Sequence, residues 1–435
     1  MNSATPQLSF LDELAWRGLL HQTTAEAELR NYLSLPGRMG YCGFDPTADS
    51  LTIGNLIPIM LLKHWQRAGH TPIVLMGGGT GMIGDPSGKD DERQLMSREQ
   101  VAANVDGQRS IFKRILDFDS GSPNAAVIVN NLDWLNELNF LEVLRDVGKH
   151  FSVNTMIQKD SVRERLHTRE QGISYTEFSY MILQAYDFLH LRREMNCTCQ
   201  IAGSDQYGNI VAGIDLIRRE FGPEGNAFGI TAPLVTTSDG KKIGKTEKGA
   251  VWLTRERTSP YAFYQFWINA SDADVISYLK WYTLMTRAEI EDLEAQHKSA
   301  PHQRAAHLAL AAHMTTMLYG RDELDRVEVA SRALFSGEVR GLEVEMLDEV
   351  FADVSSTIHD RALLEGEGVS LIEFLTQTTL ASSKRESREF LGNGAVSVNG
   401  ERVNADHRLT ASDLLHGRTI LLRRGKKKWH ATRWE

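Results

Sequence analysis

The chain has 435 residues, of which 42% are hydrophobic and 24% charged, with 35 glycines, 11 prolines and a net charge of −9. These values are typical of a folded protein of two or three domains and exclude a disordered, collagen-like or coiled-coil chain. The longest apolar stretch, residues 53–62, contains Asn55 and Pro58 and is shorter than the roughly 18 residues that a membrane span needs. We therefore expect no membrane partner and, since the N-terminus resembles no secretory leader, a cytoplasmic location.

Short apolar strands alternate with helical stretches in the first third of the chain. We expect strands over 38–44, 72–76 and 125–129, with a helix over 51–68 between the first two. This order predicts an α/β domain with a parallel sheet. A further strand is expected over 197–201. The helical pattern before it is interpreted as an insertion, which forms either a subunit interface or a lid over the pocket.

The sequence pattern changes twice in the rest of the chain. Residues 260–319 have helical periodicity throughout, whereas the acidic and glycine-rich segment that follows indicates a linker. Two short helices and a hairpin with an Asn399-Gly400 turn then predict a small α+β domain. The expected divisions are a sheet domain over 1–230 with its insertion at about 134–192, a mobile loop and helical domain over 231–340, a linker over 341–367, and a C-terminal domain over 368–435.

The glycine run from Gly77 to Gly84 follows the second strand and contains G-x-G-x-x-G. A dinucleotide site is disfavoured because an Asp-Pro turn follows where that fingerprint requires a helix. A P-loop is excluded because Ile83 and Asp90 occupy the positions of its glycine and hydroxyl residue. The loop still offers flexible backbone for a phosphate, with Lys89 and Arg93 as donors. Judged without the other motifs, the segment is equally consistent with an ordinary charged surface turn.

Two other segments carry phosphate-binding features. Residues 41–55 run from the end of the first strand into a helix, and a helix amino terminus attracts phosphate through its free N–H groups and dipole. Residues 239–246 place three lysines and two glycines in one segment. Such a loop can close over a polyphosphate and neutralise the charge of a leaving group.

The cysteines give little evidence for a metal centre. Only three are present, which is too few for a disulfide framework and agrees with a reducing compartment. Cys197 and Cys199 offer half of a zinc site, but no second Cys/His pair at ligand spacing stands nearby. We expect buried thiols and no metal held by the protein.

Taken in order, these segments resemble the bacterial tyrosyl-tRNA synthetases, a family of class I aminoacyl-tRNA synthetases. The resemblance extends from about residue 12 to residue 434. It implies a Rossmann-like nucleotide-binding domain with a helical insertion, a helical domain and a small S4-like RNA-binding domain. The motifs that carry it are Tyr41-Cys-Gly-Phe-Asp-Pro-Thr-Ala-Asp-Ser-Leu51, Gly81-Met-Ile-Gly-Asp-Pro-Ser-Gly-Lys89, the segment from Tyr175 to Phe188, Gly203-Ser-Asp-Gln206 and Lys242-Ile-Gly-Lys-Thr246.

The resemblance implies a tyrosine pocket. In the family, the residues at Tyr41 and Asp187 hydrogen-bond the phenolic hydroxyl of tyrosine, while those at Asp85, Tyr180 and Gln184 hold its ammonium group. Asn130 corresponds to another pocket residue. Independently, the i, i+4, i+7 spacing of Tyr180, Gln184 and Asp187 places the three on one helix face. Tryptophan is an unlikely substrate because it has no hydroxyl for Asp187 and Tyr41.

The resemblance also implies ATP as the second substrate. Tyrosine's carboxylate would attack the α-phosphorus and expel pyrophosphate, and Mg²⁺ is expected only as the counter-ion of ATP. No general base is needed, since a carboxylate is already ionised at neutral pH. The resemblance implies ATP-binding positions at Cys42, Gly43, Asp45, Gly54, Gly203, Asp205, Gln206 and Lys245. It implies catalytic positions, which bind the phosphates, at Thr47, Asn55, Lys89, Arg93, Lys242, Lys245 and Thr246.

The family's His-Ile-Gly-His signature is here Thr52-Ile-Gly-Asn55. Asn55 keeps an amide donor for a phosphate oxygen, whereas Thr52 is shorter than the histidine it replaces. Tyr207 likewise stands where the family has tryptophan. A weakened relative that only binds structured RNA therefore remains the alternative to an active ligase, and ligation of tyrosine to another acceptor is disfavoured by the RNA-binding tail.

The C-terminal segment fits an RNA partner. Residues 369–435 hold twelve Lys/Arg and seven Asp/Glu, a net charge of +5 on an otherwise acidic chain. The resemblance implies that Lys384, Arg385 and Arg388 share one helix face toward RNA phosphates. The run from Arg423 to Lys428 is more often only a solvated edge. The implied partners are tRNA(Tyr), L-tyrosine, ATP and a second copy of the chain in a homodimer.

Overall fold

The computed structural model describes residues 9–86, 96–119, 121–159, 162–163, 166, 172–241, 243–246, 249–352, 354–425 and 428–435. These residues form two compact units, Met1–Thr258 with Trp267–Leu318, and Ser259–Phe266 with Tyr319–Glu435. The helical segment after the sheet is thereby shared between the units. Every helix in the described ranges is too short or too polar to traverse a lipid bilayer.

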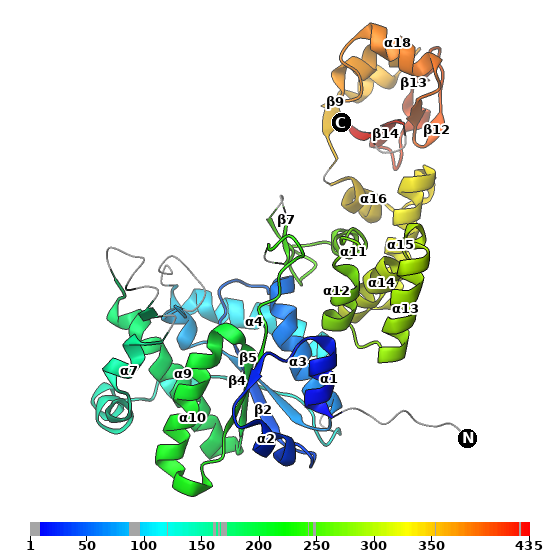
Figure 1. Ribbon diagram of the computed structural model, residues 1–435. Helices are drawn as coiled ribbons and strands as arrows, with labels where there is room; N and C mark the ends of the chain where they lie inside the picture. The colour runs from blue at the N-terminus through cyan, green and yellow to red at the C-terminus, as the bar shows by residue number, and fades with distance from the viewer. Residues whose placement is uncertain are drawn as a thin grey trace. The chain divides into compact units, whose positions relative to one another are not determined.

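The predicted parallel sheet forms the centre of the first unit (Figure 1). It has six strands in the order β1-β6-β5-β2-β3-β4, all parallel except β1, which pairs antiparallel with β6. The expected strands are found within a few residues of their predicted bounds. The strands are β1 (Gln22–Thr23), β2 (Met39–Phe44), β3 (Thr71–Met76), β4 (Val127–Asn130), β5 (Cys199–Gly203) and β6 (Phe228–Ala232).

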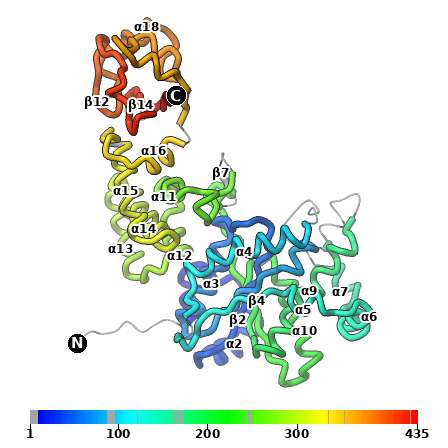
Figure 2. Tube along the Cα trace, turned by 180° about the vertical axis from the view of Figure 1, so that it is seen from behind, coloured from blue at the N-terminus to red at the C-terminus, as the bar shows by residue number. Residues whose placement is uncertain are grey.

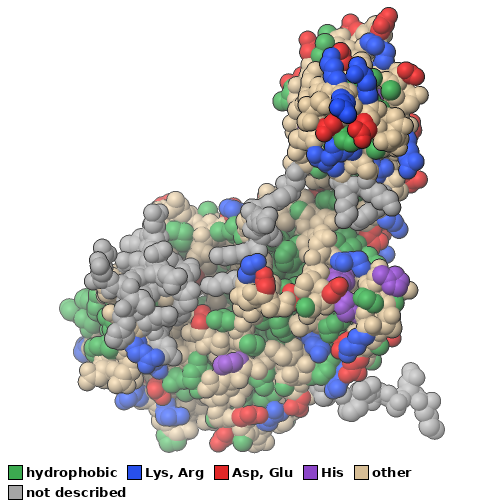
Figure 3. Space-filling model, turned by 45° about the horizontal axis from the view of Figure 1, so that its top comes forward, with side chains coloured by type: hydrophobic (Ala, Val, Ile, Leu, Met, Phe, Trp, Pro, Cys, Tyr) green, Lys and Arg blue, Asp and Glu red, His purple; other side chains and the backbone are tan. Residues whose placement is uncertain are grey.

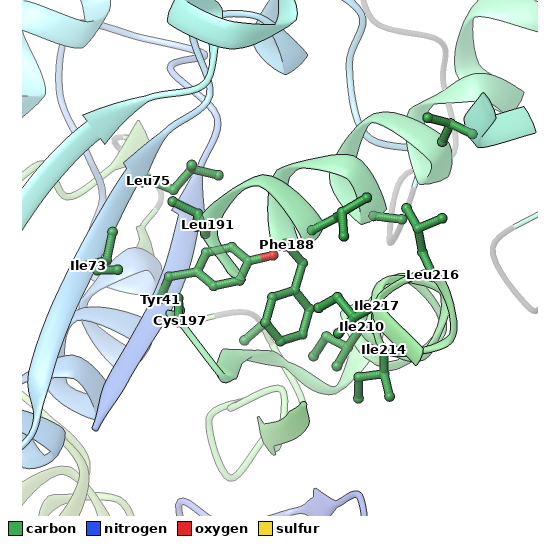
Figure 4. Packing of buried hydrophobic residues seen from close by; sticks show 14 residues of the cluster. Tyr41, Ile73, Leu75, Phe188, Leu191, Cys197, Ile210, Ile214, Leu216 and Ile217 are labelled. Carbon is green, nitrogen blue, oxygen red and sulfur yellow. The ribbon is translucent and has the colours of Figure 1, made fainter. Parts of the chain in front are cut away.

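Helices cover both faces of this sheet, because its strands are apolar on both sides. Figure 2 shows the sheet from behind, with α3 and α4 over one face. On the other face, Tyr41 of β2 points toward the helix that carries Phe188, within a buried core that β2, β3 and two long helices share (Figure 4). The helices are α1 (Phe10–Arg17), α2 (Glu26–Tyr32), α3 (Leu56–Arg67), α4 (Arg98–Ile115), α9 (Tyr175–Met195) and α10 (Tyr207–Phe221).

The region between β4 and β5, where an insertion is expected, contains short helices followed by the long α9. The short helices include α5 (Leu132–Leu135), α6 (Phe140–Glu142) and α7 (Val153–Ile157). Several of the short helices present large apolar side chains to solvent; Phe140 and Leu141 are 64% and 73% exposed. After the sheet come the hairpin strands β7 (Lys245–Thr246) and β8 (Gly249–Ala250) and the helices α11 (Pro260–Ile268), α12 (Val275–Tyr282), α13 (Arg287–Ser299) and α14 (Ala305–Tyr319).

The second unit contains a five-stranded sheet in the order β12-β11-β14-β15-β9. Its own core gathers Leu371, Phe374, Val396 and Ile420. The elements are α15 (Arg321–Ser336), α16 (Val344–Phe351), β9 (Ser356–His359), β10 (Val369–Ser370), α17 (Leu371–Phe374), α18 (Lys384–Gly392), β11 (Val396–Val398), β12 (Glu401–Arg402), β13 (Arg408–Leu409), β14 (Thr419–Arg424) and β15 (Lys428–Trp434).

Residues 341–367, for which composition suggested a linker, hold regular structure. Helix α16 buries Met346, Leu347, Val350 and Phe351 on one face, and β9 pairs in parallel with β15 at the edge of the C-terminal sheet. The acidic residues between the apolar positions hide this 3.6-residue period, which explains why composition alone was misleading.

Candidate active site

A pocket of about 650 Å³ opens at the carboxyl ends of the parallel strands, where open α/β sheets bind their ligands. Most of the side chains that the sequence suggested line it together. They are Tyr41, Cys42, Gly43, Asp45, Thr47, Gly54, Asn55, Asp85, Tyr180, Gln184, Asp187, Gly203, Asp205 and Gln206.

Other suggested residues are placed differently or not described. Lys89, Arg93 and Lys242 lie outside the described residues, and only the backbone of Lys245 and Thr246 is described, as strand β7. Asn130 ends β4 and does not line the pocket; its side-chain oxygen accepts a hydrogen bond from the Leu132 backbone N–H over 3.0 Å.

A buried carboxylate lies at the inner end of the pocket. Asp187 of α9 is 1% exposed. Its Oδ2 accepts a hydrogen bond from Asn131 Nδ2 over 2.9 Å, and its Oδ1 accepts one from Trp134 Nε1 over 2.8 Å. Both donors follow β4, and their three-residue spacing turns them toward the same side. Two fixed donors therefore orient the carboxylate while leaving acceptor capacity on each oxygen.

The pKa of Asp187 is raised to about 7, chiefly by burial and to a smaller extent by the charge of Asp45, although the hydrogen bonds from Asn131 and Trp134 lower it. Beside it, Tyr41 is completely buried, and its hydroxyl has no hydrogen-bond partner among the described residues. Burial, followed by the charge of Asp187, raises the pKa of Tyr41 well above 10. The site thus pairs a phenol that stays neutral with a carboxyl group poised to ionise near neutral pH.

A second polar chain links the pocket to the glycine run. Thr80 Oγ1 donates to Asp45 Oδ1 over 2.9 Å, and Tyr180 Oη donates to Asp45 Oδ2 over 3.1 Å. The Asn131 amide also donates to Thr80 Oγ1 over 3.0 Å, while its oxygen accepts from the Gly79 N–H over 2.7 Å. Asp45 and Asp187 are therefore held by one network.

The glycines of this run are required by close packing. A Cβ atom at Gly77 would lie 2.3 Å from Asp45 Oδ1, one at Gly78 would lie 2.2 Å from Asn130 Oδ1, and one at Gly81 would lie 2.9 Å from Pro46. The run turns through a 3₁₀ helix at Thr80–Met82 instead of entering a long helix. This geometry agrees with the rejection of a dinucleotide fingerprint.

A polar group at the other side of the pocket contains Asp85, Gln184 and Gln206. Gln206 Nε2 donates to Asp85 Oδ2 over 2.7 Å. Asn209 Nδ2 bridges Gln184 Oε1 at 3.0 Å and Gln206 Oε1 at 3.1 Å. The side chains expected to bind an ammonium group are thus held by α10 as well as by α9.

Thr52 and Asn55 form a mutual cap at the start of α3. The Thr52 backbone N–H and its Oγ1 both donate to Asn55 Oδ1, each over 3.0 Å. Because the amide oxygen is occupied, the orientation of the Asn55 side chain is fixed and its Nδ2 remains the outward donor. The replaced signature is therefore an ordered pair of residues in the pocket wall.

The chain after the lysine-containing loop is anchored to this turn. Ile53 N–H donates to the Val251 carbonyl over 3.1 Å, and Leu253 N–H donates to the Leu51 carbonyl over 2.8 Å. Gly244 has φ +83°, and a Cβ atom there would lie 3.2 Å from Ile53. A glycine is needed at this point both for its backbone conformation and for close approach.

Sequence reasoning missed Asn131, Trp134 and Thr80. Consecutive asparagines at a strand end were a visible signal, but alternation along a strand sends neighbours to opposite faces, and the strand's end decides which faces the pocket. Trp134 could have been found as the residue one helical turn beyond Asn131.

The chain is similar in sequence and in fold to known proteins. A family model described as tRNA synthetases class I (W and Y) matches residues 39–336, and one described as a Tyrosine--tRNA ligase SYY-like C-terminal domain matches residues 347–432. A Tyrosine--tRNA ligase of Bacillus caldotenax is 50% identical over 428 residues, covering 98% of this chain and 100% of the relative. One of Staphylococcus haemolyticus is 49% identical over 422 residues, covering 97% and 98%.

Among solved structures, a C-terminally truncated mitochondrial tyrosyl-tRNA synthetase of Aspergillus nidulans superposes with a TM-score of 0.68. It is 30% identical, and the match covers 76% of this chain and 95% of that one. The sequence and structural matches agree with each other and with the geometry of the pocket. The chain belongs to the class I tRNA synthetases (W and Y).

Proposed function

We propose that the protein activates L-tyrosine with ATP in this pocket and transfers the tyrosyl group to tRNA(Tyr), the tyrosine–tRNA ligase reaction. The observation that carries the proposal is that buried Asp187 and the buried hydroxyl of Tyr41, which has no hydrogen-bond partner among the residues that the structure describes, both line the pocket. A tyrosine phenol can complete both groups, whereas phenylalanine would leave the desolvated carboxylate unpaired.

The opposite polar group fits the rest of the amino acid. Asp85, Tyr180 and Gln184 offer a carboxylate and neutral oxygens, which suit an ammonium group. Asn131 and Trp134 act by positioning Asp187, and Asn130 supports the end of β4 from behind the pocket.

In this proposal, ATP binds in the part of the pocket that the glycine-containing strand ends line. Gly43, Gly54 and Gly203 allow the adenosine to approach the backbone, while Cys42, Asp45, Asp205 and Gln206 lie where its ribose and base would be. The tyrosine carboxylate oxygen bonds to the α-phosphorus, and the bond to the bridging oxygen breaks with pyrophosphate as the leaving group. The chemistry then depends on positioning and charge stabilisation.

The charge on pyrophosphate requires donors. We assign this role to Thr47 and Asn55 in the pocket wall and to Lys89, Arg93, Lys242, Lys245 and Thr246. Mg²⁺ enters as the counter-ion of the ATP phosphates. Lys245→Ala should lower the activation rate far more than it weakens tyrosine binding, because its partner charge develops during the reaction.

Transfer requires tRNA, which we assign to the C-terminal domain. Lys384, Arg385 and Arg388 are exposed on α18, and Figure 3 shows Lys and Arg side chains interspersed with Asp and Glu on the C-terminal part of the chain. Part of this charge is already neutralised, since Lys384 pairs with Glu373. Binding to phosphates through such contacts should weaken with salt.

A homodimer through the insertion is the second part of the proposal. Phe140, Leu141, Val153 and Tyr175 are all more than half exposed, and apolar side chains gathered in one region indicate a protein interface. Light scattering on Leu141→Asp should show a monomer if this assignment is correct. We place the protein in the cytoplasm, in agreement with three free cysteines.

The test of function is tyrosine charging of tRNA(Tyr) by the full chain. Formation of tyrosyl-tRNA that requires ATP supports the proposal. Binding of tRNA without charging, at saturating tyrosine and ATP, would contradict it.

A further inference from the structure

Three metal-binding side chains converge in the helical part of the first unit, outside the pocket described above. Asp272 lies in the turn before α12, His297 in the last turn of α13 and His307 near the start of α14. One potential ligand atom from each lies within 4.8 Å of the other two. They come from three separate segments, so their meeting is a product of the fold.

The separation of one pair of these atoms fits a small cation. His307 Nε2 lies 3.3 Å from Asp272 Oδ1, and ligand bonds of about 2.0 to 2.1 Å place neighbouring tetrahedral ligands roughly 3.3 Å apart. His307 is completely buried, whereas the side chain of Asp272 is 65% exposed. The site therefore has one rigid ligand and an open side through which an ion can enter.

Hydrogen bonding within the protein does not satisfy the two imidazoles. His307 Nε2 lies 3.1 Å from the Ala270 carbonyl, and His297 Nε2 lies 3.1 Å from the Asp272 carbonyl. The Nδ1 atoms of both rings are buried and have no hydrogen-bond partner among the described residues. Most buried polar atoms are hydrogen-bonded, so these two nitrogens lack the contacts that are usual for buried atoms.

The charges next to the cluster have opposite signs. Arg304, the basic residue near His307, donates its guanidinium to the Ile268 carbonyl and keeps its positive charge, while Asp272 supplies a negative one. In the part of the chain that the structure describes, the recorded ion-pair partner of Asp272 is His307. The carboxylate is therefore not already neutralised by a lysine or arginine in that set.

We propose that Asp272, His297 and His307 bind one Zn²⁺ ion, with a fourth position open to water, and that the ion joins the turn before α12 to α13 and α14. Two imidazoles and one carboxylate are ligands that Zn²⁺ prefers. The role is structural, since none of the three residues lines the synthetase pocket.

The test uses untagged full-length protein, stripped with a chelator and then titrated with Zn²⁺ alone. Bound zinc is counted by mass spectrometry of the metal, and Co²⁺ is added separately to read the ligand field by visible absorption. Wild type should bind one ion per chain and melt at a higher temperature with zinc than with chelator.

Three variants make the test specific. Asp272→Asn changes an exposed side chain and keeps its shape, so it should fold normally; His297→Ala removes a nitrogen ligand. Each should weaken zinc binding by more than the roughly 10 to 100-fold that loss of an outer-sphere partner causes and should abolish the zinc-dependent rise in melting temperature. His302→Ala removes an exposed histidine from the same connection and should behave as wild type.

The proposal is overturned if wild type binds no zinc tightly, or if Asp272→Asn and His297→Ala bind it as wild type does. All variants should melt alike in chelator, which separates loss of the ion from a folding defect. Tyrosine-dependent pyrophosphate exchange should be unchanged in all three, so a failure here is distinguishable from a failure of the proposed function.

Discussion

Asn131 donates a hydrogen bond to Asp187 over 2.9 Å, and both side chains are almost fully buried. The same asparagine bonds Thr80 and the Gly79 backbone. Asn131, which directly follows β4, thus fixes the carboxylate proposed to recognise the substrate hydroxyl.

Asn131→Ala should weaken tyrosine binding by about 5- to 150-fold, since loss of one partner of a buried polar group costs about 1 to 3 kcal/mol. The rate of activation at saturating tyrosine should change less. Steady-state pyrophosphate exchange measures both quantities. Asn130→Ala is the matched control, because Asn130 contacts the Leu132 backbone and not Asp187; an equal effect of the two changes would contradict the assignment.

Tyrosine affinity should depend on pH through Asp187. Its pKa is raised to about 7 in the free protein, and the ionised form is the acceptor for the phenol. As pH falls below 7, the carboxyl group takes up a proton and affinity should decrease by up to about tenfold per pH unit. Above 7 the affinity should level off until the ammonium group of the substrate loses its proton, which happens at lower pH than ionisation of the phenol.

Equilibrium dialysis with labelled tyrosine from about pH 5.5 to 8.5 tests this dependence. Asp187→Asn cannot ionise and should show weak binding without the same slope. A wild-type affinity that stays constant below pH 7 would mean that the carboxyl group is not the titrating acceptor.

Thr52→Val should lower the activation rate by about 2- to 12-fold, the effect of losing one hydrogen bond of about 0.5 to 1.5 kcal/mol. The lost bond runs from Thr52 Oγ1 to Asn55 Oδ1, so the amide would be held only by the backbone N–H of residue 52. Thr52→Ser retains the hydroxyl and should stay near wild type. Single-turnover formation of tyrosyl-adenylate provides the measurement, and identical rates for Val and Ser would contradict a positioning role.

Gly77→Ala should reduce kcat/KM for tyrosine by about 5- to 150-fold, since overpacking costs about 1 to 3 kcal/mol. The added methyl group would meet Asp45 Oδ1 at 2.3 Å and Thr80 Oγ1 at 2.6 Å, which displaces the network. Gly121→Ala is the control, because its nearest neighbour would lie at 3.5 Å. Wild-type activity of Gly77→Ala would show that the close contact can relax.

The parallel sheet could be predicted because β2, β3, β4 and β5 are short apolar runs separated by helical patterns. Much of the pocket followed from motifs, and those residues do meet at the strand ends. In α9, the helical spacing correctly placed Tyr180, Gln184 and Asp187 along one wall. These features depend on local sequence.

The features that could not be predicted depend on long-range packing. Which of Asn130 and Asn131 meets Asp187 depends on where β4 ends, and strand ends are poorly marked in a sequence. Thr52 looked like a lost histidine, because its bond to Asn55 becomes visible only when the helix start is formed. Likewise, β9 is too short to recognise without β15 beside it.

The most direct test of the central claim is tyrosine-dependent exchange of labelled pyrophosphate into ATP, measured without tRNA and compared with phenylalanine and tryptophan. The structure predicts strong exchange with tyrosine, little with the other two, and loss of the tyrosine preference in Asp187→Asn. Equal exchange with phenylalanine, or no exchange with tyrosine, would contradict the assignment of this pocket.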